Sequence, residues 1–122
     1  MKLEDQVSSL ELSMRLKDLG VRQESYFVWA KDGTIFSEGG IGFRMNHHDG
    51  TDECAAFTVA ELGEMLPTDK VQTLKWFDIY YCEAWEDVVN KKGSIGKFID
   101  ETEANARAKM LIRLIEKGIV KP

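Results

Sequence analysis

The C-terminal segment 100–120, DETEANARAKMLIRLIEKGIV, constrains the fold most, because it has the pattern of one amphipathic helix. Asp100 is placed to cap its N-terminus, with Glu103 completing a capping box, and Gly118 is placed to end it. Small or apolar side chains recur along one helical face: Ala104, Ala108, Leu111 and Ile115. Because alanine allows close approach, the segment predicts a helix packed on a flat surface such as a sheet.

The length and charge of the chain limit the classes of protein it can belong to. Its 122 residues are the size of one domain, which can bury a core without disulfides or metals. The net charge of −5 disfavours general binding to nucleic acid, which attracts cationic surfaces. No apolar run approaches the roughly 20 residues of a membrane span. Cys54 and Cys82 form no CxxC pattern, so we expect them to be free thiols. Together these features predict one cytoplasmic domain over residues 1–122 that does not bind a membrane.

Local patterns predict how the rest of the chain alternates between helices and strands. Ser8 with Glu11, and Thr58 with Glu61, are capping boxes that open helices. Asp32-Gly33 is a tight turn between two apolar runs, as in a hairpin. The expected segments are, in chain order, a frayed lead-in over 1–7, a helix over 8–19, strands over 26–30, 34–36 and 41–45, an exposed loop over 46–53, a helix over 59–66, strands over 74–85 and 95–99, and the closing helix.

This order of elements predicts an α+β fold. We expect an antiparallel sheet of about four to five strands packed with helices, in the order α-β-β-(β)-α-β-β-α. The segment 74–85 is the best strand, and aromatic side chains on both of its faces indicate a central position. One predicted face carries Leu74, Trp76, Asp78, Tyr80 and Cys82, and the other carries Lys75, Phe77, Ile79, Tyr81 and Glu83.

Two long segments of the chain, FTVAELGEMLP at 57–67 and ETEANARAKMLIRLIEKG at 101–118, are distinctive. They resemble a family of small uncharacterised phage and prophage proteins, which share segments like TVAELGEMLP and EADARAKMLIYLIENG. The opening LKDLGVRQESYFVW at 16–29 is also similar to the start of that family. The resemblance implies a phage or prophage origin and the cytoplasm of a host cell, and it implies no activity. Many relatives have Tyr or Pro where this chain has Cys54 and Ala55, so Cys54 is a poor candidate for a role shared by the family.

One polar cluster has the residue types of a metal site. Its central residues are His47, His48 and Asp49, whose imidazole and carboxylate groups suit zinc, nickel or iron. They follow no fixed ligand spacing such as HExxH, and a solvated acidic loop explains the same residues. A metal-binding protein or metal-dependent enzyme using these three residues is therefore an alternative interpretation.

Aromatic side chains recur along the best predicted strand: Trp76, Tyr80, Tyr81 and Trp85. Such side chains can stack on nucleic-acid bases, so a single-stranded nucleic-acid binder that uses the Trp76/Tyr80 face is a second alternative. Aromatic residues more often fill a core. Trp85 lies beside Glu86 and Asp87, and an aromatic residue among acids is more typical of a protein contact. We therefore predict Trp85, Glu86 and Asp87 as protein-contact residues.

No constellation of catalytic residues is identified, and no cofactor is expected. The segment SEGGIG lacks the spacing and the lysine of a phosphate-binding loop, and the neighbours of Cys82 do not activate a thiol. Enzymatic activity stays open. The sequence predicts first a non-enzymatic accessory protein that binds a host or phage protein, as a monomer or as a homodimer through a strand edge or the first helix.

Overall fold

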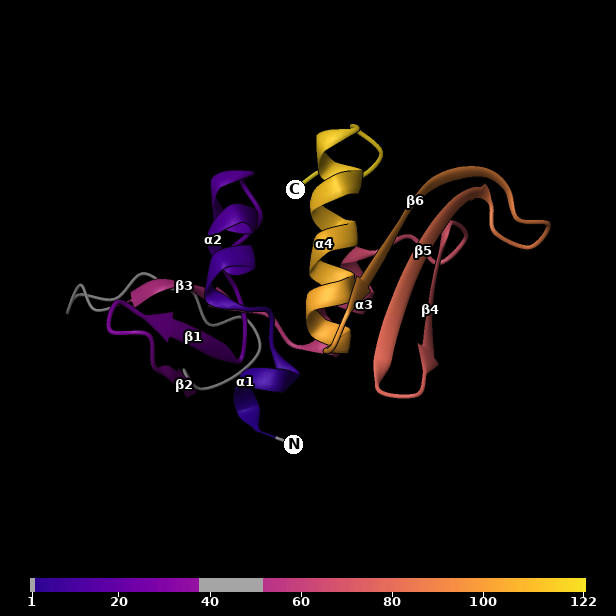
Figure 1. Ribbon diagram of the computed structural model, residues 1–122. Coiled ribbons are helices and arrows are strands. Elements are labelled where there is room, and N and C mark those ends of the chain that lie inside the picture. The colour runs from indigo at the N-terminus through magenta and orange to yellow at the C-terminus, as the bar shows by residue number, and fades with distance from the viewer. Residues whose placement is uncertain (1, 38–51) are drawn as a thin grey trace.

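The computed structural model describes residues 2–37 and 52–122 and has an α+β fold (Figure 1). The elements are α1 (Leu3–Gln6), α2 (Leu10–Asp18), β1 (Phe27–Ala30), β2 (Ile35–Ser37), β3 (Asp52–Ala56), α3 (Val59–Met65), β4 (Val71–Trp76), β5 (Ile79–Asp87), β6 (Lys92–Asp100) and α4 (Glu103–Glu116). The α+β class is confirmed. The described strands form two antiparallel three-stranded sheets, ordered β2-β1-β3 and β4-β5-β6, where one sheet was expected.

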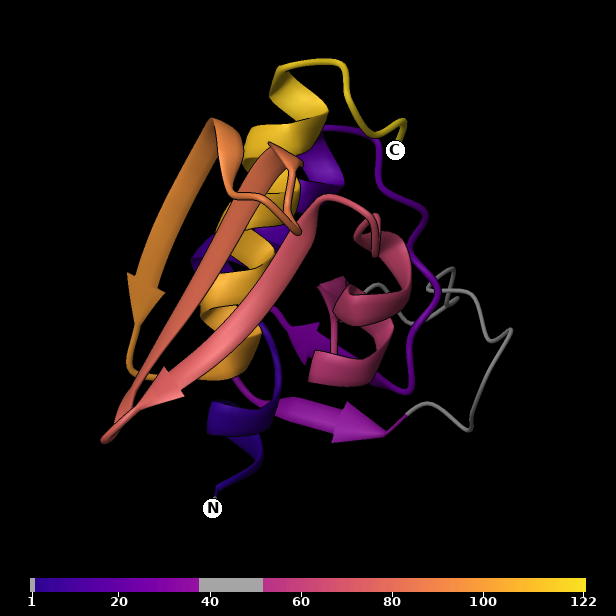
Figure 2. The same cartoon turned by 90° about the vertical axis from the view of Figure 1, so that its right-hand side faces the viewer.

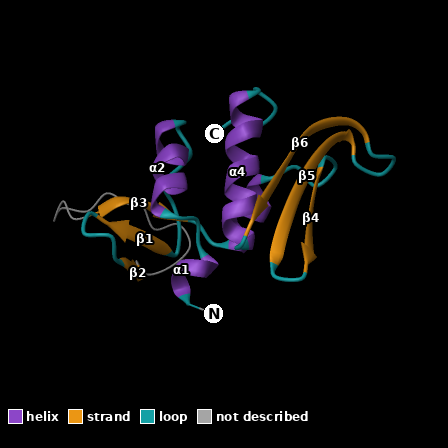
Figure 3. Cartoon of the chain, viewed as in Figure 1, coloured by secondary structure: helices purple, strands orange, loops and turns teal. Residues whose placement is uncertain are grey.

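Helix α4 lies between the two sheets, as Figures 1 and 3 show. It contacts β5 and β6 on one side and α2 and α3 on others. Its buried side chains are Ala104, Ala106, Ala108, Met110, Leu111, Ile112 and Leu114. Ile115 of the predicted stripe is only partly buried, and the buried set extends beyond the stripe because α4 is covered on more than one side. None of the described helices is long and apolar enough to cross a membrane.

The start of α4 differs from the prediction. Thr102, not Asp100, is the N-cap, and its side chain accepts a hydrogen bond from the backbone N–H of Asn105 at 3.2 Å. Asp100 is instead the last residue of β6, where its carboxylate pairs with Lys109 at 2.7 Å. The pairing of Asp100 with Tyr80 across the sheet extends the strand and moves the cap along the chain. Gly118 ends the helix with a φ of 75°, as predicted.

The N-terminal segment is also more ordered than predicted. Residues 3–6 form α1, and Val7 is fully buried and bridged to Thr58. The cap of α2 is Ser9, whose side chain accepts from the backbone N–H of Leu12 at 3.2 Å. Ser8 does not cap the helix, because its buried hydroxyl bonds the Ser13 hydroxyl at 2.7 Å and accepts from the backbone N–H of Phe57 at 3.1 Å.

The first sheet contains the predicted hairpin of β1 and β2, in which Val28 lies opposite Phe36. Strand β3 pairs with the other edge of β1 and was not predicted, since the loop was expected to continue through Glu53. The strand expected over 41–45 lies outside the described residues. The capping box of Thr58 and Glu61 at the start of α3 is confirmed.

The strand predicted over 74–85 is two strands. The chain turns at Phe77-Asp78, where Phe77 has a positive φ of 56°, and β4 then pairs antiparallel with β5. Strand β5 is central in its sheet, which agrees with the position predicted for this segment. The predicted faces are wrong, because Leu74 and Trp76 share a face with Tyr81 instead of with Tyr80 and Cys82. The sequence pattern missed the turn because no Gly or Pro marks it.

Candidate functional site

The outer face of the sheet β4-β5-β6 carries apolar side chains that no described element covers. Helix α4 packs on the inner face, where Cys82 and Ala84 are fully buried. Figure 2 views the sheet from its outer side, with α4 behind it. We call the outer surface the apolar face, and its residues are Leu74, Trp76, Phe77, Ile79, Tyr81 and Ile99.

Strand register explains why these side chains gather. Leu74 lies opposite Tyr81, and Tyr81 lies opposite Ile99, so the three form one row across the sheet. Trp76 and Ile79 form the next row toward the turn. Residues directly opposite one another in an antiparallel sheet project from the same face. The Phe77 ring meets the Trp76 ring edge-on, with their centroids 5.6 Å apart.

The degree of exposure makes this face unusual. Trp76 is 66% exposed and Phe77 is 82% exposed, although both are large aromatic residues. Together with Leu74, Ile79 and Ile99 they leave roughly 500 Å² of apolar surface in water. That is near the upper end for the largest apolar patch of a monomeric protein, and such patches mark interaction sites.

Charges of opposite sign border the two ends of the apolar face. Exposed Asp78 and Glu101 lie at the end with the β4–β5 turn. A hollow of about 430 Å³ at this end is lined by Ile79, Ile99, Asp100 and Glu101.

At the other end, Lys97 is the accessible charge. Its ammonium lies 3.9 Å from the Glu83 carboxylate and 4.8 Å from the centre of the Tyr81 ring. The Lys97 side chain is 53% exposed, whereas that of Glu83 is only 14% exposed. Glu83 also accepts a hydrogen bond from the Gln72 amide at 3.1 Å. The apolar face therefore runs from an acidic end to an end where a lysine is presented to solvent.

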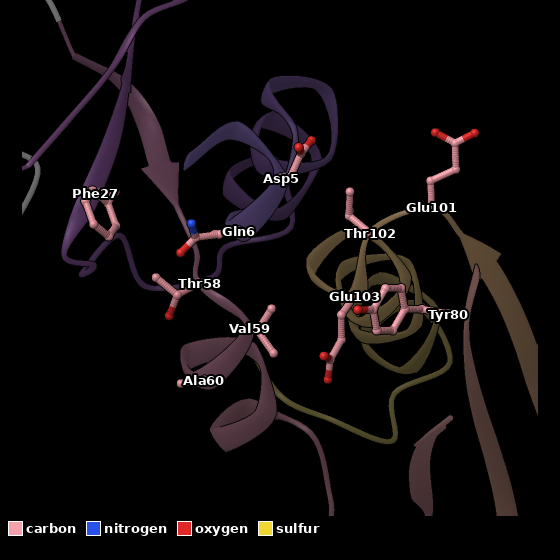
Figure 4. A pocket seen from close by; sticks show the side chains of 10 residues that line it. All are labelled: Asp5, Gln6, Phe27, Thr58, Val59, Ala60, Tyr80, Glu101, Thr102 and Glu103. Carbon is pink, nitrogen blue, oxygen red and sulfur yellow. The ribbon is translucent and has the colours of Figure 1, made fainter. Parts of the chain in front are cut away.

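A cavity of about 500 Å³ lies between the starts of α3 and α4 (Figure 4). Its lining residues come from α1, β1, α3, β5 and the segment entering α4: Asp5, Gln6, Phe27, Thr58, Val59, Ala60, Tyr80, Glu101, Thr102 and Glu103. The Glu103 carboxylate is already paired with Arg107 at 2.7 Å. Among the described residues that line this cavity, none is Lys, Arg, His or Cys.

The predicted contact residues Trp85, Glu86 and Asp87 lie at the end of β5 that is far from the β4–β5 turn. Trp85 is half-buried, and its buried indole N–H has no hydrogen-bond partner in the part of the chain that the structure describes. Glu86 is exposed. The Asp87 carboxylate accepts bonds from the Asn90 side chain at 2.9 Å and backbone at 3.1 Å, and these bonds lower the pKa of Asp87. A protein contact at these three residues stays a prediction.

The sequence also offered two alternative sites, a metal site and a face for stacking nucleic-acid bases. His47, His48 and Asp49 lie outside the described residues, so a metal site there stays a prediction. Within residues 2–37 and 53–122, no group of three or more His, Cys, Asp or Glu side chains is arranged to hold a metal ion. The proposed base-stacking face is divided by the sheet, since Tyr80 packs against the core on the inner side while Trp76 and Tyr81 lie on the outer side.

Cys54 and Cys82 are free thiols, as predicted, and both are fully buried. Burial raises the pKa of Cys54 to about 12 and also raises the pKa of Cys82. We expect neither thiol to react with Ellman's reagent at about pH 8 while the protein is folded, and both to react in denaturant. The free energy of unfolding should also fall as the pH rises above 9.0, because only the unfolded thiols then lose protons. Rapid stoichiometric colour from the folded protein would contradict this expectation.

Sequence reasoning missed the apolar face because it assigned Leu74 and Trp76 to a strand covered on both sides. Asp78 is the one local hint of the turn that moves these residues to an open face. Apolar residues on both sides of a strand cannot show which side a helix will cover.

Comparison with known proteins assigns the chain to no family. No protein-family model, curated protein or solved structure matches the chain. The similarity of segments 57–67 and 101–118 to phage proteins stays an expectation, and the function is argued from the apolar face.

Proposed function

We propose that the chain is a non-enzymatic protein-binding module and that its partner docks on the apolar face. The observation that supports this proposal is the exposure of Trp76, on the uncovered face of the sheet, and of Phe77, in the turn beside it. Tryptophan is enriched among the residues that dominate the energy of protein interfaces. Burying roughly 500 Å² of apolar surface stabilises a complex by about 12 kcal/mol, which offsets a cost of association of about 4–15 kcal/mol.

The border of the apolar face defines the chemistry of the partner. Asp78 and Glu101 favour a basic group at one end, and Lys97 favours an acidic group at the other. The partner surface therefore has an apolar centre with one positive and one negative border. A nucleic acid fits poorly, because its phosphates would meet Asp78 and Glu101 beside the exposed rings. With the resemblance to phage proteins, this chemistry points to a host or phage protein met in the host cytoplasm.

Site-specific photo-cross-linking in bacterial cells tests the proposal. The photoreactive residue p-benzoylphenylalanine replaces Trp76 in one variant and Val89 in a control variant. Val89 is 86% exposed but lies in the β5–β6 turn, away from the β4–β5 turn. We expect protein cross-links from position 76 and few from position 89, because only the first lies on the apolar face. Equal yields at the two positions, or nucleic acid as the cross-linked species at position 76, would refute the proposal.

A further inference from the structure

We infer that the protein docked on the apolar face is a second copy of this chain, in a two-fold symmetric dimer. The inference rests on the proposed function, since it names the partner for the same surface. It differs from the dimer through a strand edge or the first helix, which the sequence analysis left open beside a monomer.

The apolar face has a basic group at one end and an acidic group at the other, so a second copy of the same face can pair with both. Lys97 and Ile99 are two residues apart in β6 and project from the same side of the sheet, and Glu101, which follows the strand, lines the same hollow as Ile99. The two charged residues are four positions apart in the sequence, so they are at most about 13 Å apart along the chain, at an extended rise of about 3.3 Å per residue. One copy therefore offers both the basic and the acidic group that the other copy requires, at opposite ends of the apolar face.

In the dimer, the apolar faces of the two copies face each other. A two-fold axis that lies midway between the two sheets, perpendicular to the strands, brings the basic group of each copy to the acidic group of the other. This axis reverses the strand direction of the second copy while β6 stays over β6. Lys97 of each copy then meets Glu101 of the other copy. Both contacts form at once, because an interface of this symmetry uses the same patch twice.

The same axis places apolar side chains against apolar side chains. The central row of Leu74, Tyr81 and Ile99 lies against its own symmetry copy when the axis passes over that row. The two sheets then form a sandwich, whose layers pack about 10 Å apart with interdigitated side chains. Trp76 lies in the row beside this centre and packs over the end of the second copy that carries Gln72 and Lys97.

The size of the surface agrees with a dimer interface. A standard interface buries about 800 Å² on each partner. The exposed apolar side chains supply roughly 500 Å² of this area, and the bordering polar residues supply the remainder. Each chain carries a net charge of −5, but the repulsion between two copies is screened beyond about 8 Å at about 0.15 M salt.

Sedimentation velocity of the full chain tests the inference, at protein concentrations from about 1 to about 100 μM. We expect a species of twice the 13.9 kDa of one chain. The variant Trp76→Ser should dissociate this species, because it removes the largest exposed ring from the face. Far-ultraviolet circular dichroism of each variant checks that the fold is intact.

A charge exchange tests the orientation of the two copies. Lys97→Glu and Glu101→Lys should each weaken self-association about tenfold, because each places like charges opposite one another. An equimolar mixture of the two variants should associate as well as the unaltered chain, since every contact across the axis then joins opposite charges. If a variant associated weakly only because it had lost an ion pair that stabilises its own fold, mixing the two variants would not restore association.

The outcomes separate this inference from the proposed function. A monomer over the whole concentration range, with cross-links from position 76 to a different protein, would overturn the dimer and leave the protein-binding module in place. A dimer that neither Trp76→Ser nor the charge variants weaken would also overturn the inference, because its interface would lie elsewhere. Absence of any protein cross-link from position 76 would overturn both.

Discussion

Replacing Leu111 by Asp is expected to unfold the protein, with a loss of about 3 kcal/mol or more in the free energy of unfolding. Leu111 is 1% exposed and lies in the middle of α4, within the core that α4 shares with α2, α3 and the sheet β4-β5-β6. A carboxylate at this position would be buried without a partner. Thermal melting followed by circular dichroism at the helical band measures the effect.

The matched control is Val89→Asp, which adds the same charge at an exposed apolar residue. Val89 is 86% exposed in the β5–β6 turn, so its replacement should change the free energy of unfolding by less than about 0.5 kcal/mol. A Leu111→Asp variant that melts with the unaltered protein would show that α4 does not hold the core together as described.

Replacing Phe57 by Ala is expected to cost about 3–5 kcal/mol, because it leaves a cavity in the core. Phe57 is 1% exposed and is the largest fully buried side chain in the described part of the chain. It lies between β3 and α3, and its backbone N–H and C=O both bond to Ser8, at 3.1 and 2.8 Å. Urea unfolding, with the midpoint and the slope fitted separately, measures the loss.

The variant Phe57→Leu separates the cavity from other effects. Leucine retains most of the buried volume, so its cost should be under about 1.5 kcal/mol. The backbone bonds to Ser8 are present in both variants and cannot account for a difference between them. Equal destabilisation by Ala and Leu would contradict the cavity explanation.

Features of the fold that depend on near neighbours in the chain were predicted from the sequence. The capping box of Thr58 and Glu61 and the end of α4 at Gly118 both appear as expected. These features depend on contacts within a few residues, which the sequence displays directly. The Asp32-Gly33 turn and its hairpin were predicted for the same reason.

Caps that compete with distant partners were predicted wrongly. Ser8 has the spacing of a cap, but its hydroxyl bonds Ser13 and Phe57 in the core, and Ser9 caps α2 instead. Asp100 also has the spacing of a cap, but pairing with Tyr80 extends β6 to that residue. In both cases a contact with a residue distant in the chain engages the residue that the local pattern predicted as the helix cap.

The α+β class and the amphipathic character of α4 follow from the order of residues along the chain, because helical and strand periodicities arise from neighbouring side chains. The tertiary structure alone decided that the strands divide into two sheets around α4, and that Trp76 faces water while Cys82 is buried. A turn at Phe77-Asp78 without Gly or Pro sets the register of β4 on β5, and that register assigns each side chain to a face. Which face remains open depends on where α4 packs, and this depends on contacts between residues that are distant in the chain.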